Sequence, residues 1–306
     1  MAKRSRVLVT GGAGFIGRRV VRALLAAGHE VTVADLRAFP DSAVRSVVGD
    51  LCDPEGPARA VRPGTDVIIH LAAVTSVLAT VADPVSAHRL NVDATARLLE
   101  LARENEVGTF LFASTNAVVG GGSEVGEVIT ERAVLRPLTP YGATKAAAEM
   151  LLGSYANCYG LTGAALRFSN VYGPGMGEKD SFIPRLMRAA RDGEGVQVRG
   201  DGSMLRDVVH VDDVVQGILA AWRGGHNGPL ILGSGRSVTV NEMVTTARKV
   251  TGALIPAERV PVGHGEMPAV VLDISAAKAL GYRPAFDLET GMATVWPDFA
   301  PEGVLS

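Results

Sequence analysis

The sequence of 306 residues predicts an α/β fold, a doubly wound parallel sheet with a smaller, mixed α/β C-terminal region. Two observations support this prediction. Apolar, β-branched runs alternate with helical patterns as far as Phe168, which is typical of a parallel sheet with helices on both faces. The first run, Val7-Leu8-Val9, leads through a glycine-rich turn directly into a helix, as the opening unit of such sheets commonly does.

The composition is that of a globular protein and excludes several classes of function. The 47% hydrophobic content, at 20% charged residues, argues against disorder. The net charge of -2, without a basic run, argues against nucleic acid as a partner. Cys52 and Cys158 are too few for a disulfide framework and are expected to be reduced thiols. Because no signal peptide or membrane-spanning stretch is recognisable, we expect a cytoplasmic protein with no membrane partner.

The glycine-rich turn has the spacing of a dinucleotide-binding loop. Gly11, Gly14 and Gly17 allow a tight turn, close approach of a pyrophosphate and close packing of the following helix, which begins near Phe15. Free N–H groups at the start of that helix would face the anion. A Walker A loop is excluded because Arg18-Arg19 stands in place of Lys-Ser/Thr. The turn by itself could still be an ordinary glycine-rich loop, so other residues must decide.

The second predicted strand, at 30–35, ends in an acid that points to the identity of the dinucleotide. Asp35 lies close to the spacing at which a carboxylate accepts hydrogen bonds from the adenosine ribose hydroxyls. A negative charge there would repel a 2′-phosphate, so NAD is favoured over NADP, although Arg37 lies nearby. The other interpretation is a turn residue at the end of a strand. After this glycine turn, Asp35 favours a Rossmann-type domain that binds NAD.

The remaining elements follow from the same patterns. Apolar runs predict further strands at 47–51, 66–73, 109–114 and 162–168, and helical patterns predict helices at 83–104 and 140–159. Beyond Pro174 we expect helices at 182–191, 212–222, 240–251 and 288–296, with a strand at 229–232 that returns to the sheet. The expected domains are an NAD-binding domain at 1–168, to which 209–232 returns, and a substrate-binding cap at 169–208 and 233–306.

Metal sites and activated serine sites are not expected. The sequence has no His-Glu-x-x-His pattern, no cysteine cluster and no Gly-x-Ser-x-Gly turn. His70 lies in a continuously apolar strand and is expected to be a packed or hydrogen-bonded structural residue. Asp212 and Asp213 resemble a pair of catalytic carboxylates. Because both fall in the opening turn of a predicted helix, where acids interact favourably with the dipole, a capping role is favoured.

Tyr141 and Lys145 form the strongest candidate for a catalytic pair. They are four residues apart on the helix predicted at 140–159 and therefore lie on one face. An ammonium beside a phenol favours the phenolate and lowers the phenol pKa from about 10. The same lysine can hydrogen-bond a nicotinamide ribose. Such a pair is often only a solvated helix face, but its position one strand and one loop after the fifth strand favours a general base.

Seven short motifs are spread over nearly the whole chain. They are TGGAGFIG at 10–17, DL at 50–51, HLAA at 70–73, NV at 91–92, YGATK at 141–145, RFSNVYGP at 167–174 and GDGSMLRD at 200–207. In this combination the sequence resembles the extended short-chain dehydrogenase/reductase family. Within that family it is similar to the branch of NAD-dependent nucleotide-sugar epimerases and dehydratases, such as UDP-glucose 4-epimerase.

This resemblance implies roles for particular residues. In such enzymes the tyrosine takes a proton from a sugar hydroxyl while hydride passes to NAD, and a threonine hydrogen-bonds the same oxygen. The implied catalytic residues are Thr115, Tyr141 and Lys145. Cofactor contacts are implied for Gly11, Gly14, Phe15, Ile16, Gly17, Asp35, Leu36, Asp50, Leu51, Leu71, Ala72, Ala73, Asn91, Tyr141 and Lys145. Substrate contacts are implied for Thr80, Thr115, Asn116, Asn170 and Arg206, of which Asn170 and Arg206 would hold the diphosphate.

The residues after Thr115 bear on the type of reaction. Sugar 4,6-dehydratases of this family carry acidic residues there, because loss of water needs a general acid and a base. Asn116 and Ala117 can serve as neither, so we expect epimerisation at C4 of a UDP-hexose or related sugar through a 4-keto intermediate. A sugar or polyol dehydrogenase or reductase with net cofactor turnover is the alternative. A 4,6-dehydratase and a non-catalytic NAD-binding regulator are less favoured.

Two positions depart from the family pattern, and both keep the dehydrogenase alternative open. Val119 stands where a tyrosine is usual, and Gly263 stands where an arginine is usual. The resemblance further implies a UDP- or dTDP-linked substrate. It also implies a homodimer formed through the helix that carries the tyrosine and the preceding long helix. Ala146, Ala147 and Ala148 would allow close packing at such an interface, although alanines are ordinary in any helix.

Overall fold

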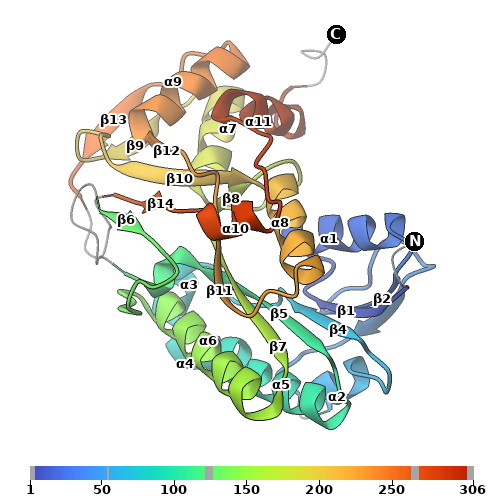
Figure 1. Ribbon diagram of the computed structural model, residues 1–306. Coiled ribbons are helices and arrows are strands. Elements are labelled where there is room, and N and C mark those ends of the chain that lie inside the picture. Colours follow the sequence, from blue (N-terminus) through green and yellow to red (C-terminus); the bar gives the residue numbers. More distant parts are fainter. Residues whose placement is uncertain (1–3, 54, 121–126, 263–268, 302–306) are drawn as a thin grey trace. The chain divides into compact units, whose positions relative to one another are not determined.

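The computed structural model describes residues 4–53, 55–120, 127–262 and 269–301, which form two units (Figure 1). The first unit contains the described residues of 1–120, 134–168 and 215–230. The second contains those of 121–133, 169–214 and 231–306. The segment 127–133 therefore belongs to the second unit, although the sequence places it between two parts of the first.

The first unit is built on a seven-stranded sheet, and the predicted fold class is confirmed. The strand order is β11-β7-β5-β4-β1-β2-β3, so the chain moves outward from β1 in both directions. All the pairings from β3 across to β7 are parallel. The strands are β1 (Arg6–Thr10), β2 (Glu30–Asp35), β3 (Arg45–Val48), β4 (Val67–His70), β5 (Thr109–Thr115), β7 (Thr162–Phe168) and β11 (Gly228–Leu232). The strand expected at 229–232 does return to this sheet, at its edge.

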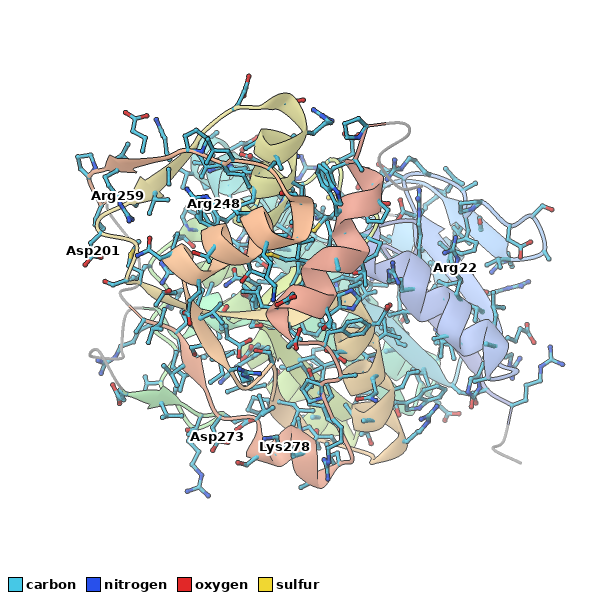
Figure 2. The ribbon with its side chains drawn as sticks, turned by 90° about the horizontal axis from the view of Figure 1, so that it is seen from above. Arg22, Asp201, Arg248, Arg259, Asp273 and Lys278 are labelled. Atoms are coloured by element: carbon cyan, nitrogen blue, oxygen red, sulfur yellow. The ribbon has the colours of Figure 1, made fainter. Side chains whose placement is uncertain are left out.

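Helices cover both faces of this sheet. They are α1 (Phe15–Ala26), α2 (Gly56–Ala60), α3 (Val77–Ala82), α4 (Pro84–His88), α5 (Ala94–Glu104) and α6 (Pro140–Tyr159). Figure 1 shows α5 and α6 on one face and α1 on the other. On α1 the side chains of Val20, Val21 and Leu24 are buried, whereas Arg22 extends from the outer face (Figure 2).

The helix expected at 83–104 is interrupted. It consists of α4, a π-helical turn at Arg89–Asp93, and α5. The predicted start is confirmed, because the Asp83 side chain accepts a hydrogen bond from the Ser86 N–H at 3.0 Å and Pro84 occupies the first turn. The sequence analysis missed α2 and α3, which are too short to show a helical period.

The core of the first unit lies between β5 and the helices α5 and α6. Leu98 and Leu99 of α5, Phe110 and Phe112 of β5, and Leu152 of α6 are at most 2% exposed. Each such side chain contributes about 1.5 to 3 kcal/mol through burial. This packing fixes α6 against the carboxyl-terminal half of β5, where the predicted catalytic residues lie.

The second unit consists of short strands and helices. A three-stranded sheet has the order β12-β10-β8, with β8 (Asn170–Tyr172), β10 (Leu205–His210) and β12 (Ser237–Thr239). Two-stranded sheets pair β9 (Val196–Arg199) with β13 (Ala257–Val260), and β6 (Val128–Ile129) with β14 (Val271–Leu272). The helices that lie or begin here are α7 (Phe182–Asp192), α8 (Val211–Arg223), α9 (Val240–Thr251), α10 (Ser275–Ala279) and α11 (Leu288–Val295). The four predicted helices are present to within about one residue, whereas the sequence analysis missed most of the short strands.

Local signals account for the ends of the longer helices. At the start of α9 the Thr239 hydroxyl accepts from the Glu242 N–H at 3.0 Å, and the Glu242 carboxylate accepts from the Thr239 N–H at 2.6 Å. Gly252 ends the helix in the left-handed conformation, at φ +68°. Of the helices described here, none combines the length and the apolar character that crossing a bilayer would need. Cys52 and Cys158 are free thiols, as expected.

Candidate functional site

The glycine turn between β1 and α1 has a backbone that larger residues would obstruct. Gly11 adopts φ +67° and its N–H donates to the Ala34 carbonyl at 2.8 Å. A Cβ atom added at Gly17 would lie 2.0 Å from the Gly11 carbonyl oxygen. The helix therefore starts in direct backbone contact with the turn, and only glycine fits at both positions.

This turn meets the geometric requirements of a pyrophosphate site. The first N–H groups of α1, which include those of Phe15 and Ile16, have no acceptor within the helix because of helix geometry. The first turn of α1 carries no acidic residue, so its positive end is available to an anion. The residues present therefore fit the diphosphate of a dinucleotide.

Asp35, at the end of β2, lies across the same turn. Its Oδ2 accepts a hydrogen bond from the Ala13 N–H at 3.0 Å, and its Oδ1 accepts from the Arg37 N–H at 3.2 Å. A ribose attached to a diphosphate on this turn would meet that carboxylate. Leu36, next to it, is 68% exposed and can cover such a ligand.

His70 is a structural residue, as predicted. Its Nδ1 lies 2.6 Å from the Thr10 hydroxyl and its Nε2 lies 2.9 Å from the Thr95 hydroxyl. The Thr95 hydroxyl donates to the Asn91 carbonyl at 2.8 Å, so it accepts from Nε2–H, and Nδ1 is the ring acceptor. Burial and, to a smaller extent, the charge of Lys145 together lower the pKa of His70 to about 3. The imidazole is neutral, and the described residues contain no cluster of potential metal ligands.

Asn91 links the loop after β4 to α6. Its Oδ1 accepts from the Val74 N–H at 2.9 Å, and its Nδ2 donates to the Val74 carbonyl and to the Thr144 hydroxyl at 3.1 and 3.0 Å. The Thr144 hydroxyl in turn donates to the Tyr141 carbonyl at 2.8 Å. The side chain of Asn91 is thus fully engaged by the protein, so a role in cofactor binding would be indirect.

The other residues predicted to contact the cofactor lie around the same sheet edge. Leu71, Ala72 and Ala73 follow β4 and are half-buried. The Ala72 N–H donates to the Thr10 hydroxyl at 3.3 Å. Asp50 is exposed and its Oδ1 accepts from the Cys52 N–H at 2.9 Å. Leu51 is 7% exposed and belongs to the hydrophobic core, so little of its surface is available to a ligand.

Thr115 and Tyr141 are brought together by β5 and α6. Thr115 is the last residue of β5, and Tyr141 lies in the first turn of α6, where Thr139 caps the helix. Burial raises the pKa of Tyr141 to about 12, while its hydrogen bond with the Thr115 hydroxyl acts in the opposite direction. The phenol is therefore protonated at neutral pH in the protein without ligands.

Lys145 is buried beneath this pair. Its side chain is 2% exposed, its Nζ donates to the Ala113 carbonyl at 2.8 Å, and it lies 4.6 Å from the centre of the Phe112 ring. Burial lowers the pKa of Lys145 to about 7, and the negative charge of Glu149 opposes this shift. The Tyr141 pKa is therefore raised, whereas the sequence predicts that it is lowered, because the loss of hydration on burial is the largest effect on this phenol.

The two residues directly after Thr115, Asn116 and Ala117, have no acidic side chain. Asn116 is 8% exposed, and its Oδ1 accepts from the Thr115 hydroxyl at 3.4 Å. The Ala117 N–H donates back to the Thr115 oxygen at 3.2 Å. Val119, where the family pattern has tyrosine, is 4% exposed and packs into the interior. Gly263, the other departure, lies outside the described residues.

The structure does not support the substrate contact predicted for Thr80. Its side chain has no exposed surface, and its hydroxyl donates to the Val77 carbonyl of its own helix at 2.8 Å. A ligand could reach this hydroxyl only if α3 moved. The expectation failed because the sequence places Thr80 near the site but does not show which face of a short helix it occupies.

Sequence reasoning missed a charged cluster beside Lys145. Glu149 of α6 and Arg167 of β7 form a buried ion pair, and the Ser114 hydroxyl of β5 donates to the same carboxylate. The spacing of four residues between Lys145 and Glu149 was a visible signal. The register that pairs Ser114 with Arg167 was not, because it depends on contacts between distant segments.

The residues predicted to hold the diphosphate lie in the second unit, on neighbouring strands. Asn170 begins β8, and its Nδ2 donates to the Asp207 carbonyl of β10 at 3.1 Å. The register pairs Asn170 with Val208, so Arg206 lies on the same sheet face as that partner. Asn170 and Arg206 thus lie on neighbouring strands of one sheet, and the Arg206 guanidinium donates to the carbonyl of Leu205 at 2.8 Å.

Asp212 and Asp213 lie in the first turn of α8, as predicted. Asp213, however, accepts hydrogen bonds from the Ala285 and Phe286 N–H groups, at 2.8 and 3.3 Å. Its carboxylate thus anchors a loop instead of capping its own helix. With both acceptors committed to backbone groups, Asp213 has a structural role.

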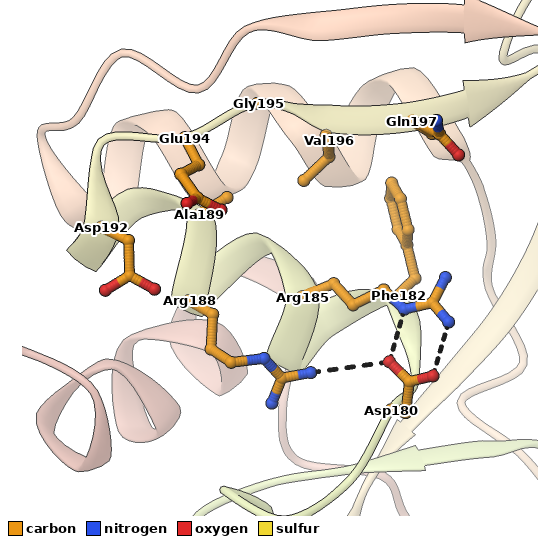
Figure 3. Close-up of a pocket in the computed structure, with 10 residues that line it drawn as sticks. All are labelled: Asp180, Phe182, Arg185, Arg188, Ala189, Asp192, Glu194, Gly195, Val196 and Gln197. Carbon is orange, nitrogen blue, oxygen red and sulfur yellow. Dashed lines mark hydrogen bonds and ion pairs between the residues drawn. The ribbon is translucent and has the colours of Figure 1, made fainter.

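The second unit also contains a cleft of about 330 Å³ beside α7 and β9 (Figure 3). Asp180, Arg185 and Arg188 line it together with seven other residues. Arg185 forms two hydrogen bonds of 2.7 Å with Asp180, and Arg188 lies 3.7 Å from the same carboxylate. None of the site residues predicted from the sequence lines this cleft. The positive charges of Arg185 and Arg188 are largely balanced by the Asp180 carboxylate beside them.

Comparison with known proteins identifies the relatives of this chain. Residues 7–232 match the model of the NAD dependent epimerase/dehydratase family. The chain is 34% identical to dTDP-glucose 4,6-dehydratase of Streptomyces griseus, over 98% of this chain and 99% of that protein. It is 33% identical to UDP-glucose 4-epimerase of Streptomyces lividans, over 92% of each chain.

The fold is shared with solved members of the same group. The structure of UDP-glucose 4-epimerase from Thermus thermophilus in complex with NAD superposes with a TM-score of 0.89 at 33% identity. The match covers 98% of this chain and 99% of that one. The predictions of family, fold class and NAD as cofactor are thereby confirmed. The chain belongs to the NAD dependent epimerase/dehydratase family, within the extended short-chain dehydrogenases/reductases.

Proposed function

We propose that this protein is an NAD-dependent nucleotide-sugar epimerase that acts at C4 of a UDP-hexose through a transient 4-keto intermediate. The observation that carries the proposal is the group formed by Thr115 at the end of β5 and by Tyr141 and Lys145 of α6. Asn116 and Ala117, which follow Thr115, add no acid or base to it. This group can take a proton from one hydroxyl and return it. It contains no further acid or base for a second reaction.

Each residue of the group has a distinct chemical task. Tyr141 removes the proton of the C4 hydroxyl, and the Thr115 hydroxyl hydrogen-bonds the same oxygen as charge develops on it. Lys145 supplies a positive charge that favours the phenolate and can hydrogen-bond the nicotinamide ribose. When bound, NAD supplies the acceptor, and then the donor, of the C4 hydride. After the keto sugar has rotated to present its opposite face to the cofactor, Tyr141 returns its proton to the C4 oxygen.

In the protein without ligands, burial disfavours the charged forms of both Tyr141 and Lys145. Burial raises the pKa of Tyr141 to about 12, so its phenol is protonated at neutral pH and does not accept a proton, and burial lowers the pKa of Lys145 to about 7. Positive charge that a bound cofactor brings to this site would favour the phenolate form of Tyr141. We therefore infer that Tyr141 becomes an effective base only when the cofactor is bound.

A dehydratase is the competing assignment, because relatives that are 34% and 33% identical to this chain bear that name. Dehydration needs an acid for the departing hydroxyl and a base for the adjacent carbon. The amide of Asn116 and the methyl group of Ala117 cannot provide either. Epimerisation, which needs only reversible oxidation at one carbon, is the reaction that these residues can support.

The proposal is tested by examining the purified protein for NAD by mass spectrometry and then following UDP- and dTDP-sugars by NMR. We expect retained NAD, conversion of UDP-glucose to its C4 epimer and no accumulation of NADH. A 4-keto-6-deoxy product would establish a dehydratase instead. A steady rise in NADH absorbance would establish a dehydrogenase, and NAD binding without any turnover would indicate a regulator.

In this proposal the adenosine ribose is held by Asp35. We expect Asp35→Ala to lower NAD affinity by about ten- to a hundredfold, because hydrogen bonds to a charged acceptor are lost. NADP affinity should fall less, because the repulsion of its 2′-phosphate is also removed. Titration of each cofactor by calorimetry measures both changes, with Asp41→Ala, an exposed carboxylate on the same loop, as the control. Equal losses for NAD and NADP would contradict the assignment.

We also propose that two copies pair through the outer side of α6 and the helices beside it. Leu78 and Val81 of α3, Val85 of α4 and Met150 of α6 are 58 to 71% exposed, and both shorter helices pack against α6. Exposed apolar side chains gathered in this way are typical of an interface. Of the three alanines expected there, Ala146 and Ala148 are buried within their own unit, whereas Ala147 is partly exposed.

We expect the wild-type protein to elute as a dimer and Met150→Lys to shift it toward the monomer. A charge at the centre of an apolar interface is costly unless it is paired. Size-exclusion chromatography with light scattering at micromolar concentration measures this shift. Leu254→Lys, at a residue of the second unit that is 80% exposed, is the matched control. A monomeric wild-type protein would refute the proposal.

A further inference from the structure

The buried ion pair one helical turn beyond Lys145 joins three elements of the first unit. The side chains of Glu149 and Arg167 are only 6% and 5% exposed. Arg167 Nη2 lies 2.8 Å from Glu149 Oε2, and its Nε lies 3.1 Å from Oε1. The Ser114 hydroxyl donates to Oε1 as well. A single carboxylate on α6 therefore binds residues of both β5 and β7.

Stability alone does not explain these buried charges. Replacing a buried ion pair with well-packed apolar residues is often neutral or stabilising, because desolvation offsets most of the attraction. A buried pair beside a catalytic group is therefore a candidate for a role in that group's chemistry. The strand register supports such a role, because Ser114 pairs with Arg167 and immediately precedes Thr115.

The charges around Lys145 single out Glu149. From α6, Tyr141 and Glu149 share the helix face of Lys145, and Arg167 of β7 is bound to Glu149. His70 of β4 is neutral, and β5 contributes only uncharged groups near Lys145, among them the Ala113 carbonyl and the Phe112 ring. Among these groups, Glu149 is the one carboxylate. It is also the charge that opposes the effect of burial on the Lys145 pKa.

We propose that Glu149 is a positioning residue whose carboxylate, fixed by Arg167 and Ser114, keeps Lys145 in its ammonium form and holds the end of β5 against α6. It acts through Lys145 and Thr115 and touches neither sugar nor cofactor. This inference rests on the proposed function, because it needs Lys145 to act as a cation beside Tyr141. The hydrogen bonds from Arg167 and Ser114 fix the orientation of the carboxylate.

The test is Glu149→Gln, which removes the charge but keeps the size of the side chain. Without the carboxylate the Lys145 pKa falls below its value of about 7. The alkaline limb of the pH profile of kcat should therefore move to lower pH by about one unit, with about tenfold lower kcat above that limb. NAD affinity, measured without any sugar, should fall about tenfold above pH 7 but change little at pH 5.

Two further variants separate this electrostatic role from a structural one. Glu149→Asp keeps the charge, so its alkaline limb should stay at the wild-type pH even where the shorter side chain lowers kcat. Glu149→Gln combined with Arg167→Met also removes the guanidinium that the single variant would leave buried without its carboxylate, so it should fold even if the single variant does not. The double variant should retain the shifted limb and the pH-dependent loss of NAD affinity.

The outcomes are distinct. A double variant with the wild-type pH profile would overturn the proposal and leave the pair a structural role. A wild-type protein without epimerase activity would refute the proposed function instead. The NAD affinity measurements would still decide the role of Glu149 in that case, because they need no sugar substrate.

Discussion

Tyr141→Phe is expected to lower kcat for epimerisation by about a thousandfold, the usual size of a general acid–base contribution. This corresponds to about 4 kcal/mol of transition-state stabilisation. The phenylalanine ring keeps the packing of the tyrosine but cannot accept the C4 hydroxyl proton. The KM for the sugar and the amount of NAD retained should change by less than about threefold, because both depend on ground-state contacts.

Tyr155→Phe is the matched control for this experiment. Tyr155 lies on the same helix, and its hydroxyl donates to Glu100 Oε2 at 3.0 Å, on a part of α6 remote in sequence from Tyr141. Its loss should leave kcat unchanged. NMR of UDP-glucose at saturating concentration measures both variants. If Tyr141→Phe turned over at the wild-type rate, Tyr141 would not be the base.

Gly17→Ala is expected to destabilise the first unit by about 3 kcal/mol and to abolish retention of NAD. The added Cβ would lie 2.0 Å from the Gly11 carbonyl oxygen and 2.7 Å from the Gly12 Cα. Both atoms belong to the backbone, so the contact can be relieved only by pushing α1 away from the turn. That movement would displace the N–H groups of Phe15 and Ile16, which we propose bind the diphosphate of NAD.

Gly153→Ala makes the same chemical change where there is room for it. Gly153 lies in the interior of α6, and a Cβ there meets no atom within 4 Å. Because glycine is unfavourable inside a helix, this variant should be more stable by about 0.5 to 1 kcal/mol. Thermal unfolding and mass spectrometry of bound NAD measure both variants. Equal melting temperatures for the two would contradict the packing argument.

The parts of the fold that rest on periodicity could be predicted from the sequence. The helix at 140–159 and the strand at 162–168 were predicted with the boundaries that α6 and β7 have. Thr139 and Pro140 at one end and Gly160 at the other are strong local signals. The small sheets of the second unit could not be predicted, because strands such as Val128–Ile129 and Val271–Leu272 exist only through their pairing.

The candidate site, too, could be predicted only in part from the sequence. Spacing along one helix identified Tyr141 and Lys145, and the glycine turn with Asp35 identified a dinucleotide. The sequence predicts a lowered pKa for Tyr141, but that pKa is raised by burial. The prediction was wrong because the sequence does not reveal how deeply a side chain is buried. The prediction for Thr80 failed for a related reason, since exposure depends on neighbours from distant segments.

The sequence by itself determined most strands of the main sheet, the turn between β1 and α1 and the candidate pair of Tyr141 and Lys145, because each is a pattern of residues close together in the chain. The tertiary structure decided which charges are buried and what they contact. Glu149, Arg167 and Ser114 lie on three different elements, and only the packing of α6 over β5 and β7 brings them to one point. Burial then sets the pKa values of Tyr141 and Lys145, and hydration lost in a folded interior cannot be inferred from the order of residues.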